Sequence, residues 1–259
     1  MPTFDSYPQG TPCYVELYTP DQEAAKAFYG SLFGWALTDS DLGNGAHYTS
    51  ATLNDSHVAG LSPQFGEMAG HPAFWSVYLA VDDVDATAAA ATDAGGTVEA
   101  GPMDVMDLGR MASIQDPTGA RVNLWQARTA PGTELANEPG TPIWNELVSP
   151  DLATATAFYA TILGASWDTV PMEGGEYLML KVDDRPVAGG LPPMADGVPP
   201  HWNVYFNVTD VDETITKAES LGGKLVVPPM DMTDVGRLAC VSDPQGGMFW
   251  LMAAPAEAA

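Results

Sequence analysis

The sequence predicts an α+β fold made of four strand–helix–strand–strand–strand units, arranged as two duplicated halves. The first observation is a repeat: residues 10–35 align without gaps on residues 140–165, with 12 of 26 positions identical. Residues 75–127 align in the same way on residues 202–254, with 23 of 53 identical. The second observation is apolar spacing that changes from alternation to a helical period twice in each half. Internal similarity at a fixed spacing indicates a duplicated structural unit.

Each unit begins with the pattern of a strand followed by a helix. Val15 and Leu17 belong to an alternating run, and Asp21 then opens a helical spacing of apolar residues that Gly34 ends. The same succession returns over residues 76–96, where an Ala-rich stretch follows Asp83. The second half repeats both helix-opening aspartates, as Asp151 and Asp210.

The remainder of each unit consists of short apolar runs separated by turn residues. Residues 53–56 and 183–186 predict hairpin connections. Residues 116–119 and 243–246 read Asp-Pro-x-Gly, which places proline and glycine where tight turns favour them. We therefore expect a first half at residues 1–128 and a second at residues 141–259, with residues 129–140 as the linker between them.

Charge excludes several classes of partner. The chain carries 34 acidic and 9 basic residues, for a formal net charge of -25. Such a surface repels phosphate backbones and anionic lipids, so we expect no nucleic acid and no membrane partner. No apolar run reaches the ~20 residues that a membrane helix needs.

The cysteines and the amino terminus indicate a cellular compartment. Cys13 and Cys240 occupy non-equivalent positions of the repeat, so they form neither a disulfide framework nor a metal-binding spacing. The first five residues lack the basic start and apolar run of a signal peptide. We expect a cytoplasmic protein.

Three motifs together resemble a known superfamily. They are Ala-Phe-Tyr in the helices at 27–29 and 157–159, Gly-Arg at 109–110 and 236–237, and the two Asp-Pro-x-Gly turns. This pattern resembles the vicinal oxygen chelate superfamily, which includes glyoxalase I, bleomycin-resistance proteins and extradiol dioxygenases. It is similar in particular to the two-domain glyoxalase-like proteins of actinomycetes. The resemblance implies four βαβββ modules, forming two curled mixed β-sheets, or cups, with helices on the outer faces and a ligand inside.

Alternation along the strands assigns side chains to the inside of each cup, because successive side chains point to opposite faces. Whether modules pair within a half or across the halves stays open. For the first cup we expect the inward residues Tyr14, Glu16, Ser76, Tyr78, Asn123 and Trp125. For the second cup we expect Trp144, Glu146, Asn203, Tyr205, Trp250 and Met252.

The resemblance also allows a test for the family's metal. In metal-dependent members, His or Glu stands seven residues before the helix-opening Asp and seven residues after the Asp of the turn. A divalent ion usually needs three or more such protein ligands. We therefore expect no metal site and no cofactor, because the six positions hold Tyr14, Ser76, Asn123, Trp144, Asn203 and Trp250.

Other ionisable residues offer weaker candidates. The four histidines, at positions 47, 57, 71 and 201, have no histidine equivalents in the other half, so we interpret them as surface or packing residues. Arg110 and Arg237 follow a repeated Met-Asp-x-x-Asp-x-Gly motif. They are candidate ligand-binding residues, but each could instead pair with the nearby aspartates.

Glu16 and Glu146 are the candidate catalytic residues. Partial burial of a carboxylate on the cup wall would raise its pKa toward the range of a general base, suited to removing a proton next to a carbonyl. Alternatively, each Glu accepts hydrogen bonds from a neighbouring strand or from Arg110 or Arg237, in a packing role. Both interpretations stay open.

The aromatic lining of the cups suggests a function. Flat rings with polar groups suit the binding of small planar molecules. We therefore expect a metal-free protein that binds a small aromatic or carbonyl-bearing metabolite, as a monomer containing an internal pseudo-dimer or as a homodimer. The alternative is an enzyme of glyoxalase type, or one that tailors natural products, with Glu16 or Glu146 as base. Bulky rings that close the second cup, or a fold retained as an interaction scaffold, are further possibilities.

Overall fold

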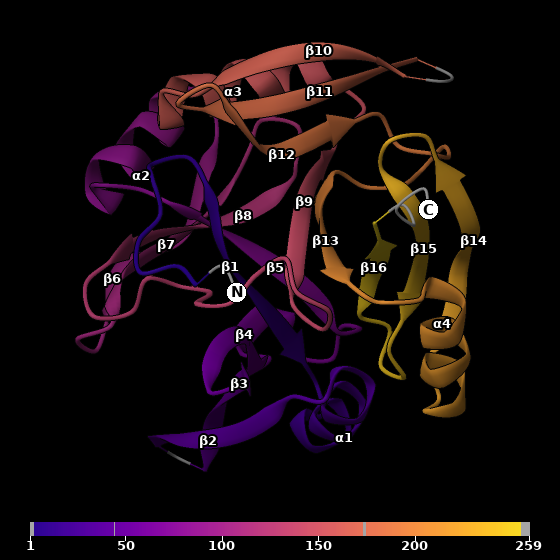
Figure 1. The fold of residues 1–259 in the computed structure, drawn as a ribbon. Helices are drawn as coiled ribbons and strands as arrows, with labels where there is room; N and C mark the ends of the chain where they lie inside the picture. Colours follow the sequence, from indigo (N-terminus) through magenta and orange to yellow (C-terminus); the bar gives the residue numbers. More distant parts are fainter. Residues whose placement is uncertain (1–2, 44, 173–174, 255–259) are drawn as a thin grey trace.

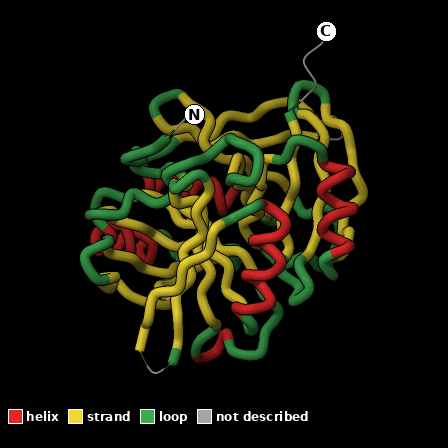
Figure 2. The backbone as a smooth tube through the Cα atoms, turned by 60° about the horizontal axis from the view of Figure 1, so that its bottom comes forward, coloured by secondary structure: helices red, strands yellow, loops and turns green. Residues whose placement is uncertain are grey.

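The computed structural model describes residues 3–43, 45–172 and 175–254, which form two eight-stranded sheets and four α-helices (Figures 1 and 2). The outer limits of the predicted halves, residues 1 and 259, lie outside these ranges. The predicted α+β class with curled sheets is confirmed.

The first sheet contains the strands of the first half in the order β2-β3-β4-β1-β5-β8-β7-β6. Its two central strands, β1 and β5, are antiparallel, and Glu16 pairs with Ser76. On either side of this pair lies a parallel neighbour, β4 beside β1 and β8 beside β5. The strands are β1 (Pro12–Thr19), β2 (Ala36–Gly43), β3 (Ala46–Leu53), β4 (Ser56–Pro63), β5 (Phe74–Ala80), β6 (Thr97–Val105), β7 (Gly109–Gln115) and β8 (Arg121–Ala127).

The second sheet repeats this topology in the order β10-β11-β12-β9-β13-β16-β15-β14, and Glu146 pairs with Asn203 across its centre. Modules therefore pair within each half, which resolves the alternative that the sequence left open. The strands are β9 (Pro142–Val148), β10 (Ser166–Met172), β11 (Gly175–Val182), β12 (Arg185–Leu191), β13 (His201–Asn207), β14 (Lys224–Met232), β15 (Gly236–Ser242) and β16 (Met248–Ala253).

Each module contributes one α-helix that begins at the predicted aspartate. The helices are α1 (Gln22–Phe33), α2 (Val84–Asp93), α3 (Leu152–Leu163) and α4 (Val211–Ser220), and a short 3-10 helix covers Gly66–Met68. The N-cap carboxylates of Asp21, Asp83, Asp151 and Asp210 each accept a backbone N–H from the first turn. This satisfies a donor that the helix itself leaves free. Gly34 ends α1 in the left-handed conformation, at φ 76°.

The predicted turns are also present. Asn54 and Asp55 have φ values of 52° and 62°, and Asp183 and Asp184 have φ values of 49° and 60°, as a two-residue hairpin turn of type I′ requires. In the Asp-Pro-x-Gly turns, the carboxylate of Asp116 accepts the backbone N–H groups of residues 118–120. The Asp243 carboxylate holds its turn in the same way.

The two sheets pack against each other through the faces that carry the helices. Strands β5 and β13 meet at the centre, with α1 beside α4 and α2 beside α3 (Figure 1). One apolar core extends through both halves. At its centre, the ring of Phe206 lies 4.9 Å from that of Phe33 and 5.1 Å from that of Trp75, measured between centroids. This packing leaves the inner faces of the two sheets free to form separate cups.

Each Asp-Pro-x-Gly turn is anchored to the opposite half. The Tyr29 hydroxyl of α1 donates to the carboxylate of Asp243 over 3.0 Å and accepts the indole N–H of Trp75 at 3.0 Å. In the second half, the Tyr159 hydroxyl likewise accepts the indole N–H of Trp202 at 2.9 Å. The turn of the first half is anchored to the second half by the Ser149 hydroxyl, which donates to the Thr118 hydroxyl over 3.0 Å. These paired contacts give the interface the approximate symmetry of a dimer.

The predicted linker, residues 129–140, is folded against the first half. Thr133 donates its backbone N–H to the carbonyl of Cys13 over 2.8 Å, and Glu134 donates to that of His57 over 2.7 Å. Leu135 is only 1% exposed and belongs to the apolar core. The segment therefore contributes to the structure of the molecule as well as connecting its halves.

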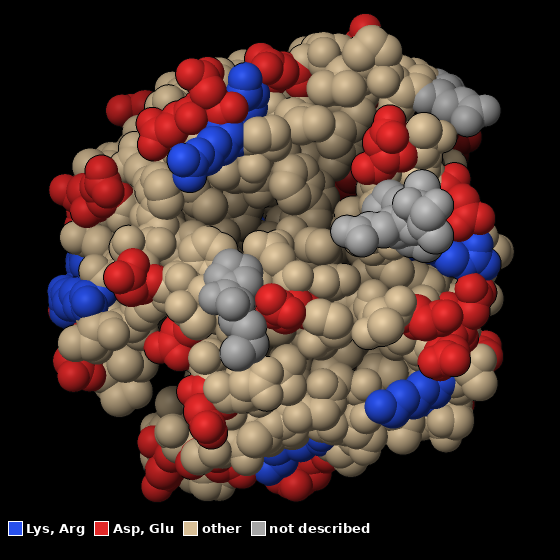
Figure 3. Space-filling model, in the orientation of Figure 1, with Lys and Arg blue, Asp and Glu red and all other residues tan. Residues whose placement is uncertain are grey.

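Acidic side chains are spread over both halves on the face seen in Figure 3. Among the described residues, no helix combines the length and the apolar character needed to cross a membrane.

The interface aromatic cluster should dominate stability. Phe206 is completely buried, so Phe206→Ala should lower the free energy of unfolding by about 3–5 kcal/mol through lost burial and a residual cavity. Urea denaturation followed by tryptophan fluorescence measures this loss. Phe65, which is 47% exposed, provides the control, and Phe65→Ala should change stability by less than about 0.5 kcal/mol. An equal loss of unfolding free energy in the two variants would contradict an apolar core that both halves share.

Candidate functional site

The inner face of the first cup is built around the buried carboxylate of Glu16, which is 5% exposed. The alternation of β1 puts Val15 and Leu17 into the core and Glu16 on the opposite face. The Tyr78 hydroxyl of β5 donates a short hydrogen bond to this carboxylate. Tyr18 and Ser62 also hydrogen bond to it. Burial raises the pKa of the Glu16 carboxyl, while these three hydrogen bonds act in the opposite direction.

A second group of polar side chains lies beside Glu16. The Tyr14 hydroxyl is 2.6 Å from the Tyr48 hydroxyl and 3.4 Å from Nε2 of His57, whose ring stacks on that of Tyr14. Burial lowers the pKa of His57, which favours the neutral imidazole. Gly60 pairs with Glu16 in the adjacent strand. A Cβ atom at Gly60 would overlap the hydroxyls of both tyrosines, so glycine allows them to converge here.

The other side of the first cup carries a chain of neutral polar groups. The Asn123 amide donates to the Ser76 hydroxyl at 2.9 Å and accepts from the Ser113 hydroxyl at 2.5 Å. Trp125 lies edge-on to Tyr78, and its indole N–H donates to the carbonyl of Ala130. Ser76 and Trp125 are half-buried, as are Tyr14, Tyr18 and Tyr48, whereas Glu16, Tyr78 and Asn123 are buried. The cup thus presents hydroxyls and ring faces above a deeper carboxylate.

The second cup retains the carboxylate but has a more apolar wall. Glu146 is 6% exposed and accepts a hydrogen bond of 2.5 Å from the Tyr205 hydroxyl. Burial raises the pKa of Glu146, while hydrogen bonds from Tyr205, Tyr177 and Asn203 oppose this rise. The Trp144 indole donates to the Tyr177 hydroxyl at 2.8 Å.

Trp250 fills part of this second face. Its ring stacks on that of Tyr205 with a centroid distance of 5.4 Å, and it is 7% exposed. Leu238 and Cys240 are buried against it, and Met230 and Met252 pack alongside. Polar residues of the first cup thus have less polar equivalents here: Tyr18, Ser62, Ser113 and Asn123 correspond to Val148, Leu191, Cys240 and Trp250.

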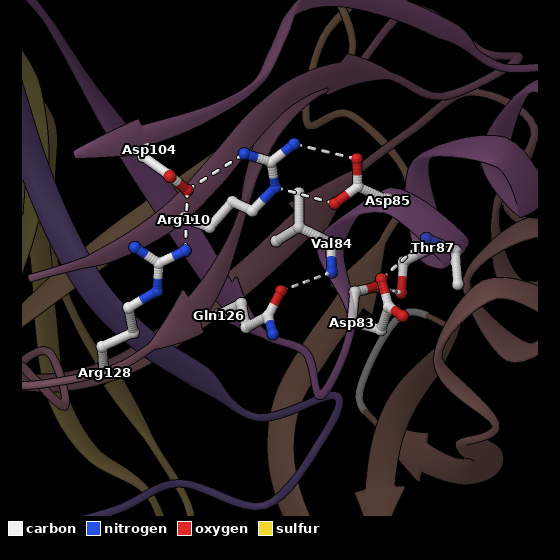
Figure 4. Close-up of polar contacts among 9 residues, drawn as sticks. Asp83, Val84, Asp85, Thr87, Asp104, Arg110, Gln126 and Arg128 are labelled. Carbon is white, nitrogen blue, oxygen red and sulfur yellow. Dashed lines mark hydrogen bonds and ion pairs between the residues drawn. The ribbon is translucent and has the colours of Figure 1, made fainter. Parts of the chain in front are cut away.

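The predicted arginines lie away from the cups. Arg110 projects from β7 toward the first turn of α2, where its guanidinium pairs with Asp85, and it also pairs with Asp104 (Figure 4). Arg237 pairs with Asp212 and Asp231 in the same arrangement. Both arginines thus form ion pairs, the alternative that the sequence left open, and their charged groups lie on the helix-bearing side of the sheet. Neither guanidinium contacts Glu16 or Glu146, which bond instead to tyrosines of the neighbouring strand.

Several residues of the first cup were missed by the sequence analysis. Tyr18 and Ser113 follow the alternation of β1 and β7, so the strand period could have found them. Tyr48, His57 and Ser62 lie on β3 and β4, whose register depends on the hairpin and on a bulge near Ala51. The sequence pattern alone did not determine which face they occupy.

The donor set of the cups does not fit the metal of the fold family. The three family positions of the first cup carry a phenol, an alcohol and an amide, at Tyr14, Ser76 and Asn123, and these groups are hydrogen bonded to neighbours. The second cup offers two indoles and an amide at its three positions. Within the described ranges, no group of three or more His, Cys, Asp or Glu side chains could hold an ion. Hydroxyl, amide and indole groups are poor substitutes for the imidazole and carboxylate ligands of divalent metals.

Comparison with known proteins agrees with this architecture. Residues 13–124 and 136–251 each match the model of the glyoxalase/bleomycin resistance protein/dioxygenase superfamily. Two modules per half, curled into a sheet with outer helices, are what this family fold requires. The chain belongs to this superfamily, as its sequence motifs predicted.

Full-length relatives share this organisation. A Mycobacterium tuberculosis protein named "Putative glyoxylase CFP32" is 46% identical over 252 residues, covering 96% of this chain and 97% of that protein. The anthracycline biosynthesis protein DnrV of Streptomyces peucetius is 37% identical over 254 residues, covering 93% and 92%.

A solved structure shows the same fold at lower identity. The Mn(II)-bound glyoxalase from Novosphingobium aromaticivorans superposes with a TM-score of 0.66 at 19% identity, covering 95% of this chain and 83% of that one.

The pairing of glycine with tyrosine can be tested. Gly60→Ala should force Tyr48 and Tyr14 apart and lower the free energy of unfolding by about 1–3 kcal/mol, the cost of overpacking. Gly189→Ala should behave alike, because its added Cβ would overlap Tyr177. Gly175, where no atom of the described residues lies within 4 Å of an added Cβ, provides the control. Thermal unfolding and the tyrosine ring signals in NMR spectra measure the effect, and an unchanged Tyr48 signal in Gly60→Ala would contradict it.

The buried carboxylate should also make stability depend on pH. Because the folded-state pKa of Glu16 is raised, the carboxyl ionises more readily in the unfolded chain, and its contribution to stability falls as pH rises through the folded-state pKa. Glu16→Gln cannot ionise but keeps an oxygen that accepts from Tyr78. The Tm of the variant minus that of the wild type should therefore increase from pH 5 to pH 8. Differential scanning calorimetry measures this difference, and Glu176→Gln, at an exposed position, controls for the loss of one charge.

Proposed function

We propose that the protein binds a small, oxygen-bearing aromatic metabolite in the first cup, without a metal ion. The observation that carries this proposal is the concentration of hydroxyl groups around the buried Glu16 carboxylate on a wall that is only half-buried at its rim. Tyrosine rings supply flat apolar surface, and their hydroxyls supply donors and acceptors. A planar molecule with carbonyl or hydroxyl substituents is the ligand whose chemistry matches both.

The polar groups of the wall would select oxygen substituents. Tyr18 and Ser76 are half-buried and neutral. The Ser76 hydroxyl accepts from Asn123, so its own proton can be donated to a ligand carbonyl, whereas the Tyr18 hydroxyl donates to Glu16 and can accept from a ligand hydroxyl. Glu16 lies beneath them and would attract a ligand hydroxyl or hold the orientation of Tyr78. The neutral groups at the family's metal positions support binding by hydrogen bonds instead of by an ion.

The name of one relative is consistent with this ligand class. The Streptomyces peucetius relative is named for the biosynthesis of anthracyclines, which are polycyclic aromatic compounds with carbonyl groups. The second cup, which carries Trp250 where the first cup has Asn123, is better suited to an apolar ligand or to a packing role. The helix-bearing faces of the two sheets already cover each other, which supports a monomer that acts as its own pseudo-dimer. We propose the cytoplasm as its compartment, from the cysteine usage.

An enzymatic role is the second candidate, and the burial of Glu16 favours it. A carboxylate with a raised pKa is a stronger base, and it could remove a proton from carbon next to a ligand carbonyl. The hydroxyls of Tyr14 or Tyr18 would then stabilise the oxygen that gains negative charge. Glu146 would serve the same role in the second cup.

A binding measurement tests the first proposal. The probe is 1,4-dihydroxyanthraquinone, and isothermal titration calorimetry with metal-free protein should show saturable binding. Tyr78→Phe removes the hydrogen bond that orients Glu16 in the site, and it should weaken binding about two- to tenfold, the value of one net hydrogen bond. The equivalent change in the second cup, Tyr205→Phe, is the matched control and should leave the affinity unchanged. The absence of binding, or equal effects in both variants, would contradict a ligand site in the first cup.

Recovery of the ligand separates binding from turnover. Mass spectrometry of the probe after incubation should return it unaltered if the protein only binds. For any substrate that is converted, Glu16→Gln should reduce kcat by at least about 100-fold, the usual contribution of a general base. Undiminished turnover in the double variant Glu16→Gln/Glu146→Gln would show that neither carboxylate acts as the base.

A further inference from the structure

A cavity of about 240 Å³ lies at the junction of the two halves, where Tyr14 of the first cup and Trp144 of the second also line it. Its walls come from the first residues of β1 and β9, from β12, from the connecting segment and from the amino-terminal segment. The Tyr7 hydroxyl donates to the carbonyl of Thr133 over 2.6 Å and so ties the last two walls together. The residues that line it include Thr11, Val15, Ile143, Asn145 and Val187.

Asn145 is the unusual residue of this cavity. It occupies the position equivalent to Val15, on the core-facing side of β9, and it is only 8% exposed. Within the part of the chain that the structure describes, its buried side-chain oxygen has no hydrogen-bond partner, and neither does the hydroxyl oxygen of Thr11, which also lines the cavity. An unpaired buried polar group costs free energy, so an amide at this position requires a partner.

The character of the wall limits what that partner can be. Among the described residues that line the cavity, none is Asp, Glu, Lys, Arg or His, although the chain as a whole has a net charge of -25. An ion would enter this wall without a countercharge, which is unfavourable. A cavity of about 150 Å³ already accommodates benzene, so the volume here suffices for a small ring with a substituent.

We infer that this cavity is a second binding site, for an uncharged small organic molecule whose hydroxyl or amide group hydrogen bonds to Asn145 and Thr11. The apolar body of that molecule would lie on Val15, Ile143 and Val187. Although Tyr14 and Trp144 contribute to its wall, the site differs from the cups in lacking a carboxylate. It also differs in that Asn145 has the apolar Val15 as its equivalent on β1. It does not depend on the ligand proposed for the first cup.

Methyl NMR tests this site directly, because Val15, Ile143 and Val187 report on it. The probes are phenol, toluene and benzoate, which share a ring but differ in hydrogen bonding and charge. Phenol should shift these methyl signals saturably, toluene should do so more weakly, and benzoate should leave them unchanged. Equal responses to benzoate and phenol would overturn the inference, as would signals that no probe shifts, the result expected for a cavity that holds only water.

Two variants complete the test. Asn145→Val introduces the residue of the other half, and it should weaken phenol about two- to tenfold while leaving toluene unchanged. Thr11→Val is a second variant with the same expectation, should the first fail to fold. Undiminished phenol affinity in both would exclude these groups as ligand partners. Tyr78→Phe should affect only 1,4-dihydroxyanthraquinone, so failure of this site and failure of the first-cup proposal are distinguishable.

Discussion

Packing between the helix-bearing faces of the two sheets is the constraint on which the rest of the structure depends. Phe206 inserts among rings of the first half, and Tyr29 of the first half bonds to Asp243 of the second. These contacts bury the apolar face of the central strands of both sheets. The opposite faces of both sheets therefore remain available, and polar side chains that alternate with the core residues are collected there.

Duplication supplied two such faces, and substitution has made them different. Both keep a buried Glu, a tyrosine on the neighbouring strand that donates to it, and a glycine that admits a second tyrosine. Around this common centre, the first cup carries hydroxyls and amides. The second carries Trp250, Leu238 and Cys240, packed together. Different walls around the same central residues are expected if the two cups bind different ligands. They are equally expected if the second cup has become part of a packed core.

The carboxylates show how one arrangement serves both stability and chemistry. Burial disfavours the charged form of the Glu16 carboxyl, because the charge loses its hydration. The hydrogen bonds from Tyr78, Tyr18 and Ser62 offset part of this free-energy cost. The sequence placed Glu16 correctly on the inner side of β1, since only the alternation of one strand was needed. It did not find Tyr48 or His57, because their approach to Tyr14 depends on how two further strands align. For Arg110, the sequence identified the carboxylate partners as an alternative, and Figure 4 shows the geometry that favours it.

The sequence by itself determined the elements and their fourfold repetition, because helix caps, hairpin turns and strand alternation are local properties that each segment carries. It also determined the family, through motifs that recur in both halves, and the chemical character of the side chains at the metal positions. Tertiary structure alone decided that modules pair within each half, that the connecting segment packs against the first sheet, and that a cavity with an unpaired Asn145 lies between the halves. Each of these depends on contacts between residues far apart in the chain, and the spacing of residues along a sequence does not specify which distant surfaces meet.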